Sequence, residues 1–330
     1  MWIFRKTVLG PSSVACRQDR VRATTASSGP PIATLNGQRT PLQIRHLVAV
    51  LAAFCLLPSA FCLSSSPGLY EVVEIKPHVF VWVPEDILYQ TGDPQFSRAA
   101  TAGFIITSEG VVVVNTTNNP LNARDLLYEI RERTSQPVKY VINTDWRGNH
   151  MLGNEVFADL QATIISTSVA QVKMREYQRD LERRMEGDPR LQARMRGIHF
   201  ALPNQTFDAE MTLRLGSEEI RLLDLGGGAL AGGAAVYLPN AKVLFLGSFF
   251  VRGYIPRRGF SDVRAWLDIL QRVEAMEAEI FVPDEGPPGA KDDLKEFHDF
   301  LDWVANEMEQ SGIPENQKDP REAAGIVKAK

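Results

Sequence analysis

The chain has 330 residues, 44% of them hydrophobic and 23% charged, with a formal net charge of −4. This is enough to bury a large core in one big domain or two small ones. Residues 1–46 carry seven basic side chains and one acidic side chain, so the rest of the chain sums to −10. An acidic body argues against a nucleic-acid partner, because phosphate binding needs a clustered basic face.

Residues 1–64 form a predicted leader. Residues 1–40 are rich in Ser, Thr, Pro and Arg and lack apolar periodicity. Residues 47–63 are uncharged and largely apolar, with a break at Pro58. That run is marginal for a membrane span and suits a signal-peptide core, so we expect export to the periplasm or secretion. An uncleaved membrane anchor, or an organellar transit peptide, is the alternative.

The mature protein is expected to begin close after Leu63. All three cysteines, Cys16, Cys55 and Cys62, lie in the leader, so the body has no disulfides and no thiolate metal ligands. Sequencing the N-terminus of protein recovered from its native host checks the start. An intact Met1 in a soluble cytoplasmic fraction would contradict it.

The body is predicted to span residues 69–312, followed by a loose tail at 313–330. In its first half, alternating and buried apolar patterns predict strands, and Asn119-Pro120 opens a helix. The predicted strands are 70–76, 79–83, 102–106, 111–115 and 138–143, and the predicted helix is 121–133.

The second half of the body is also rich in strands. A long charged helix pair is predicted over 169–196, with a break near Asp188-Pro189. Predicted strands cover 163–166, 211–215, 220–224, 234–238, 243–246 and 280–282, and predicted helices cover 263–276 and 294–308. Strands and helices in both halves, without strict alternation, indicate two packed sheets with helices outside.

The most informative stretch is residues 141–154, VINTDWRGNHMLGN. A short buried strand runs into a polar loop that carries Asp145, Arg147, Asn149 and His150. Catalytic and binding residues often lie on loops of this kind, at the ends of strands.

The same stretch resembles the metallo-β-lactamase superfamily, whose metal loop follows a strand ending in Asn-Thr and reads T-H-x-H-x-D-H-x-x-G-N. Three further stretches, 225–233, 236–248 and 282–287, resemble the later loops of that family in the same order. The resemblance implies an α/β (α+β) fold, a four-layer αββα sandwich in which the four loops meet at one edge.

The resemblance also implies two zinc ions, but most of the ligand positions differ. The first ion would need histidines at 145, 147 and 229, where the chain has Asp145, Arg147 and Ala229. The second would need an aspartate at 149 and histidines at 150 and 285, and a bridging carboxylate at 248. The chain has Asn149, His150, Glu285 and Ser248 there, so only His150 is unchanged.

We therefore expect no cofactor and a decayed dinuclear site. The guanidinium of Arg147 would replace the lost cation and pair with Asp145 or Glu285. On this hypothesis the protein is a pseudoenzyme with a binding or other non-catalytic role, and a small molecule is its expected ligand. Any membrane contact would come only through an uncleaved leader.

The alternative is a hydrolase of esters, thioesters or lactams. It would use one divalent metal ion, zinc or similar, held weakly by His150 and Glu285. A site without metal would need Ser248 as nucleophile and His150 as base.

Overall fold

The computed structural model describes residues 70–85, 99–254, 256 and 262–310. The chain divides into two compact units, Met1–Ser64 and Ser65–Lys330, and all described residues belong to the second. The predicted leader and tail lie outside the described residues. Within the described ranges, no helix is long and apolar enough to cross a membrane.

The first sheet has seven strands in the order of the sequence. Its first four strands pair antiparallel and the rest are parallel. The strands are β1 (Tyr70–Lys76), β2 (Val79–Pro84), β3 (Ala102–Thr107), β4 (Gly110–Val114), β5 (Val138–Ile142), β6 (Thr163–Thr167) and β7 (Gln205–Phe207).

The second sheet has five strands in the order β12-β11-β10-β9-β8. Only the β11–β12 pair is parallel. The strands are β8 (Glu210–Leu215), β9 (Glu218–Gly226), β10 (Gly233–Leu238), β11 (Val243–Val251) and β12 (Ile280–Glu285).

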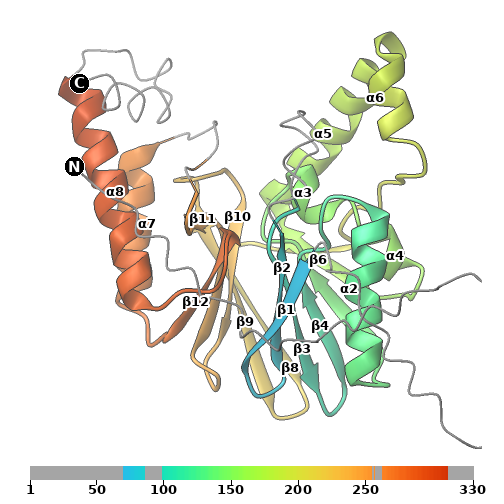
Figure 1. The fold of residues 1–330 in the computed structure, drawn as a ribbon, viewed down its shortest axis with the longest axis horizontal. Helices are drawn as coiled ribbons and strands as arrows, with labels where there is room; N and C mark the ends of the chain where they lie inside the picture. Colours follow the sequence, from blue (N-terminus) through green and yellow to red (C-terminus); the bar gives the residue numbers. More distant parts are fainter. Residues whose placement is uncertain (1–69, 86–98, 255, 257–261, 311–330) are drawn as a thin grey trace, which may run out of the picture. The chain divides into compact units, whose positions relative to one another are not determined.

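Helices cover the outer faces of both sheets (Figure 1). The first sheet packs on α2 (Pro120–Arg133) and α4 (Asn154–Ala158), and the second on α7 (Val263–Glu274) and α8 (Lys291–Gln310). Apolar side chains of the two inner faces fill the space between the sheets, among them Val81, Val112, Ile142, Leu222, Val236 and Phe245. This is the four-layer αββα sandwich expected from the sequence.

The remaining helices are α3 (Gly148–Met151), α5 (Ser168–Gly187) and α6 (Pro189–Arg194). The predicted break between α5 and α6 is confirmed. Asp188 caps α6, because its side chain accepts the N–H groups of Arg190 and Leu191 at 2.9 and 3.1 Å. Pro189 follows at the first helical position, where its missing N–H costs nothing.

Several boundaries differ from the prediction. The polar loop after β5 contains the short helices α3 and α4, and the sequence pattern did not reveal β7. Strand β11 continues through Gly247, although the Gly-Ser pair suggested an end. Strand β12 continues past Pro283, which is tolerated because β12 is the edge strand of its sheet.

Candidate functional site

The site lies where β5, β11 and β12 present polar side chains to the loop before β10. The Ala234 N–H donates to the Thr144 carbonyl oxygen at 2.8 Å, and the Trp146 indole N–H donates to the Ala231 carbonyl oxygen at 3.2 Å. These bonds hold the loop after β5 against the glycine-rich loop at 226–233. Contacts made by Arg147 bring in β11 and β12, so the four stretches expected at one edge do meet.

Arg147 is the centre of the site. Its Nη2 atom donates to Ser248 Oγ at 2.6 Å, Asp284 Oδ2 at 2.7 Å and Asp145 Oδ2 at 2.8 Å, and lies 3.1 Å from His150 Nε2. The Nε atom donates to the same Asp145 oxygen at 3.0 Å. One guanidinium nitrogen therefore contacts side chains from α3, β11 and β12 and from the loop after β5. We call these five residues the Arg147 cluster.

The Arg147 cluster is closed to solvent except at the arginine. The Asp145 and His150 side chains are 0% exposed, Asp284 is 4% exposed, and Arg147 is 26% exposed. Buried charges are costly unless each has a partner and well-placed hydrogen bonds. The two carboxylates on one guanidinium satisfy that requirement.

The local charges keep both partners ionised. Burial by itself lowers the pKa of Arg147, but Asp145 and Asp284 outweigh it and raise that pKa above its ordinary value. Burial by itself raises the pKa of Asp284, but Arg147 and His150 outweigh it and hold that pKa well below its usual range. At neutral pH the cluster therefore contains a guanidinium facing the ionised carboxylate of Asp284.

His150 is held by groups on both ring nitrogens. Its Nε2 atom lies 2.8 Å from Asp284 Oδ1 and 3.1 Å from Asp145 Oδ2, and its Nδ1 lies 3.2 Å from Thr144 Oγ1. In the described chain Asp284 Oδ1 has no hydrogen-bond partner of good geometry, so its contact with His150 Nε2 is a close approach without an aligned hydrogen bond. The same Nε2 lies 3.1 Å from Arg147 Nη2, so the ring is enclosed by the cluster on one side and by Thr144 on the other.

Ser248 is not arranged as a nucleophile. Its Oγ accepts a hydrogen bond from Arg147 and donates a short one to Asp145 Oδ2. Among the described residues, Ser248 Oγ has no hydrogen bond to His150. A serine nucleophile needs its base within hydrogen-bond reach, so the geometry does not supply the Ser248–His150 pair expected for a serine hydrolase.

The other predicted site residues lie nearby in different roles. Asn149 is half-buried on α3, and its carbonyl oxygen accepts the Ala100 N–H at 3.1 Å. Ala229 is 6% exposed and packs in the apolar core beneath α7. Glu285 is 3% exposed, and its carbonyl oxygen accepts the Arg252 N–H at 2.9 Å.

Asp284 is the functional residue that the sequence argument missed. The expected pair between Arg147 and Asp145 is present, and the second carboxylate paired with Arg147 is that of Asp284, directly before Glu285. One signal was available: Asp284 stands where the related family has glycine in this loop. An acidic side chain at a position where the resemblance leads one to expect glycine indicates a partner of opposite charge.

Buried amides fix the loop beneath the cluster. Asn143 and Asn154 exchange hydrogen bonds at 3.0 and 2.9 Å, and Thr116 Oγ1 donates to Asn154 Oδ1 at 2.8 Å. A Cβ on Gly153 would lie 2.0 Å from the Thr116 carbonyl oxygen, so only glycine fits there. The end of β5 and the start of α4 are thereby locked together.

The residues of the Arg147 cluster do not fit a pair of zinc ions. Arg147 Nη2 occupies the point on which Asp145, Ser248 and Asp284 converge. Arginine does not deprotonate to become a ligand, and its charge would repel an added cation at contact distance. Among the described residues, no group of three His, Cys, Asp or Glu side chains is arranged to hold a metal ion.

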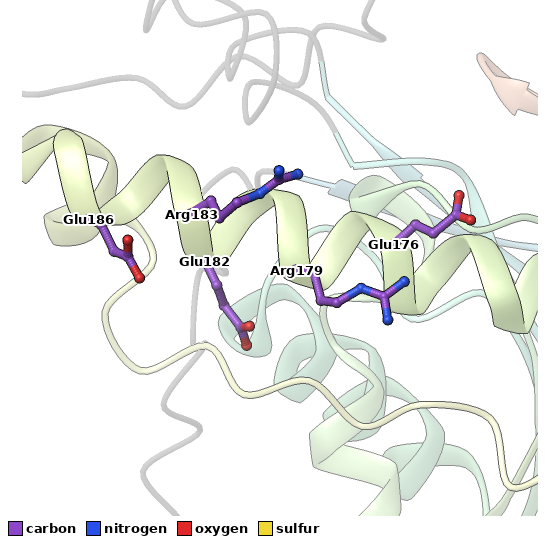
Figure 2. A pocket seen from close by; sticks show the side chains of 5 residues that line it. All are labelled: Glu176, Arg179, Glu182, Arg183 and Glu186. Atoms are coloured by element: carbon purple, nitrogen blue, oxygen red, sulfur yellow. The ribbon is translucent and has the colours of Figure 1, made fainter.

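A hollow of about 520 Å³ lies along α5, and no residue of the Arg147 cluster is among its described lining residues (Figure 2). All of its described lining side chains are charged and come from that one helix: Glu176, Arg179, Glu182, Arg183 and Glu186. Alternating charges at helical spacing are typical of a solvated helix face. The hollow therefore adds nothing to the candidate site.

Comparison with known proteins agrees with the fold. A profile of the metallo-beta-lactamase superfamily matches residues 97–285, more than half of the chain. A metallo-beta-lactamase from Pontibacter korlensis superposes with a TM-score of 0.58 at 22% identity, covering 71% of this chain and 99% of that one. The TMB-1 structure gives a TM-score of 0.56 at 18% identity, with 73% and 100% covered.

The DIM-1 metallo-beta-lactamase gives a TM-score of 0.55 at 18% identity, covering 72% of this chain and 99% of that one. At such identities the structural matches show a common fold and nothing finer. The profile match spans the loops after β5, β9 and β11 and the whole of β12. The chain belongs to the metallo-β-lactamase superfamily.

Proposed function

We propose that this chain is an exported, non-catalytic binding protein in which the Arg147 cluster has replaced the dinuclear zinc site of its superfamily. The observation that carries the proposal is the position of Arg147 Nη2. It contacts Asp145, Asp284, Ser248 and His150 at 2.6–3.1 Å, in the manner of a bound cation.

A guanidinium cannot do the chemistry of a zinc pair. Zinc lowers the pKa of a bound water enough to make hydroxide near neutral pH. Arginine has donors only and no open coordination position, so it can neither bind a water as a ligand nor activate one as a metal does. The Ser248 hydroxyl is engaged within the cluster, because it accepts from Arg147 and donates to Asp145.

What remains is a site for a small molecule at the exposed edge of Arg147. In the described part of the chain, Arg147 Nη1 has no hydrogen-bond partner, and it is not a buried atom. It therefore offers two N–H donors to an acceptor such as a carbonyl or carboxylate oxygen. The acidic body supports a small ligand over a nucleic acid.

Elemental analysis of the purified body tests the proposal. Protein produced in zinc-supplemented medium is expected to carry no stoichiometric zinc pair, because one guanidinium already fills the converging ligands. Two zinc ions per chain would overturn the proposal. One tightly held ion that disappears in His150→Ala would instead support the single-metal hydrolase with His150 and Glu285 as ligands.

A further inference from the structure

We propose that Met185 is an oxidation site, and that its conversion to the sulfoxide loosens the hairpin of α5 and α6 from the loop that carries Arg147. The reagent is a two-electron oxidant such as hydrogen peroxide. The inference concerns the hydrophobic core of this hairpin, which lies outside the Arg147 cluster. It holds whether or not Arg147 binds a ligand.

Methionine is concentrated in one hydrophobic cluster of the described chain. This cluster joins α3 to α5 and α6, and we call it the hairpin core. Its buried side chains are those of Met151, Leu152, Ala170, Met174, Leu181, Leu191 and Met195. Three of these seven are methionines, whereas the three larger clusters of the described residues have no methionine among their buried members.

A core packed by methionine is sensitive to oxidation. Sulfoxide formation turns a flexible apolar side chain into a polar one, and a polar group is costly to bury without a hydrogen-bond partner. In Figure 1 the far end of α5 and all of α6 project beyond the two sheets, so the hairpin is held by its own core. A sulfoxide in this core therefore favours conformations that turn its oxygen toward water.

Met185 is the methionine of the hairpin that an oxidant reaches first. It is half-buried in the last turn of α5, and it packs against the hairpin core. Met151, Met174 and Met195 are only 1%, 0% and 5% exposed, so the closed hairpin shields them. Oxidation therefore begins at Met185 and reaches the other three once the hairpin has opened.

The reaction with hydrogen peroxide transfers one oxygen atom. A lone pair of the Met185 sulfur attacks one peroxide oxygen, so the S–O bond forms as the O–O bond breaks. The departing hydroxide takes the proton from the transferred oxygen and leaves as water. Sulfur loses two electrons and the peroxide gains them, and methionine sulfoxide reductases reverse the change with a thiol as reductant.

The hairpin core is continuous with the loop after β5. Trp146, the neighbour of Arg147 in the sequence, packs against this core, and its ring centroid lies 6.5 Å from that of Tyr177 on α5. A Cβ on Gly148 would lie 2.6 Å from Tyr177 Oη, so α5 packs directly on the first residue of α3. A shift of α5 therefore changes the packing on both sides of Arg147 in the sequence.

The test is peroxide treatment of the purified protein, followed by peptide mass spectrometry and hydrogen–deuterium exchange. Met211 and Met276 are half-buried like Met185 but pack against other clusters, so they are internal controls for exposure. Oxidation of Met185 is expected to speed exchange in residues 146–152 and 168–196 by at least about 10-fold, because the closed hairpin loses stability. Methionine sulfoxide reductases are expected to restore the slow exchange.

Three variants separate Met185 from the other methionines. Met185→Leu keeps an apolar side chain without sulfur, so peroxide is expected to leave its hairpin exchange unchanged. Met276→Leu is the matched control and is expected to open on oxidation as the native protein does. Met185→Gln places a polar group at the same position, so it is expected to show the faster exchange without any oxidant.

Slow hairpin exchange in native protein whose Met185 is fully oxidised would overturn the inference. So would fast exchange after peroxide in Met185→Leu, because another methionine would then be responsible. Resistance of Met185 to peroxide, under conditions that oxidise Met211 and Met276, would also overturn it. Slow exchange in Met185→Gln would show that a polar group at this position does not open the hairpin.

Discussion

Replacing Arg147 by alanine is expected to lower the free energy of unfolding, measured in metal-free buffer, by about 3–5 kcal/mol. The reason is the set of groups that the change leaves behind. Asp145 and Asp284 are 0% and 4% exposed, and the Oδ2 atom of each contacts the guanidinium. Removing one partner of a buried ion pair costs more than the pair contributes, because the other charges stay buried without compensation. Urea unfolding followed by circular dichroism measures the change.

Two further substitutions at Arg147 separate charge from shape. Arg147→Lys keeps the positive charge but not the planar fork that sets Nε and Nη2 on Asp145, so an intermediate loss is expected. Arg147→Met keeps most of the volume but no charge and should lose nearly as much as alanine. A methionine variant as stable as the native protein would contradict the charge argument.

Arg264 gives a matched control outside the site. It donates to three side chains, those of Asp302, Asn306 and Glu309, between α7 and α8. Its side chain is 47% exposed, however, and its partners are also in solvent. Arg264→Ala should therefore cost no more than about 1 kcal/mol. An equal cost at Arg147 and Arg264 would show that burial does not matter here.

Most of the fold could be predicted from the sequence, because the spacing of apolar residues indicates which face of each helix or strand is buried. Strand β1 was predicted with its observed bounds, and α2 was predicted to within one residue because Asn119 and Pro120 mark its start. The Asn119 side chain accepts the N–H groups of Leu121 and Asn122, each at 2.9 Å. Local chemistry of this kind can be read without the tertiary structure.

Boundaries set by tertiary contacts could not be read in the same way. Strand β7 has three residues, too few for a period, and it exists because β6 offers it a parallel partner. In β11, Gly247 adopts φ +49°, and a Cβ there would lie 2.5 Å from Thr144 Oγ1. Glycine at this position permits close approach of the loop after β5 and does not end the strand.

The candidate site was predictable in part, because some of its residues are close together in the sequence. The loop after β5 contains Asp145, Arg147 and His150 within six residues, so their proximity follows from the sequence alone. Successive side chains on a strand point to opposite faces of the sheet. Which carboxylate of β12 pairs with Arg147 therefore depends on which of the two faces the arginine. Asp284 and Glu285 are neighbours, and only the packed sheets show that Asp284 is bonded to Arg147.

Asp284→Asn is expected to destabilise the protein at neutral pH by about 3 kcal/mol, because one of the two carboxylates on Arg147 is lost from a buried pair. The loss of stability caused by Asp284→Asn should become smaller at low pH. Arg147 and His150 hold the pKa of Asp284 below its ordinary value of 3.8. A carboxyl with a depressed folded-state pKa contributes stability that is fully present above the unfolded value and is lost as pH falls through the folded one.

The difference between native protein and Asp284→Asn should therefore be constant from neutral pH down to about pH 4, and shrink below it. Between the two pKa values of Asp284, the native free energy of unfolding should fall by up to about 1.4 kcal/mol per pH unit more steeply than that of the variant. Urea unfolding at a series of acidic pH values gives both curves. Curves that stay parallel below pH 3.8 would mean that Asp284 is not the ionised partner of Arg147, because an unshifted carboxyl adds no slope.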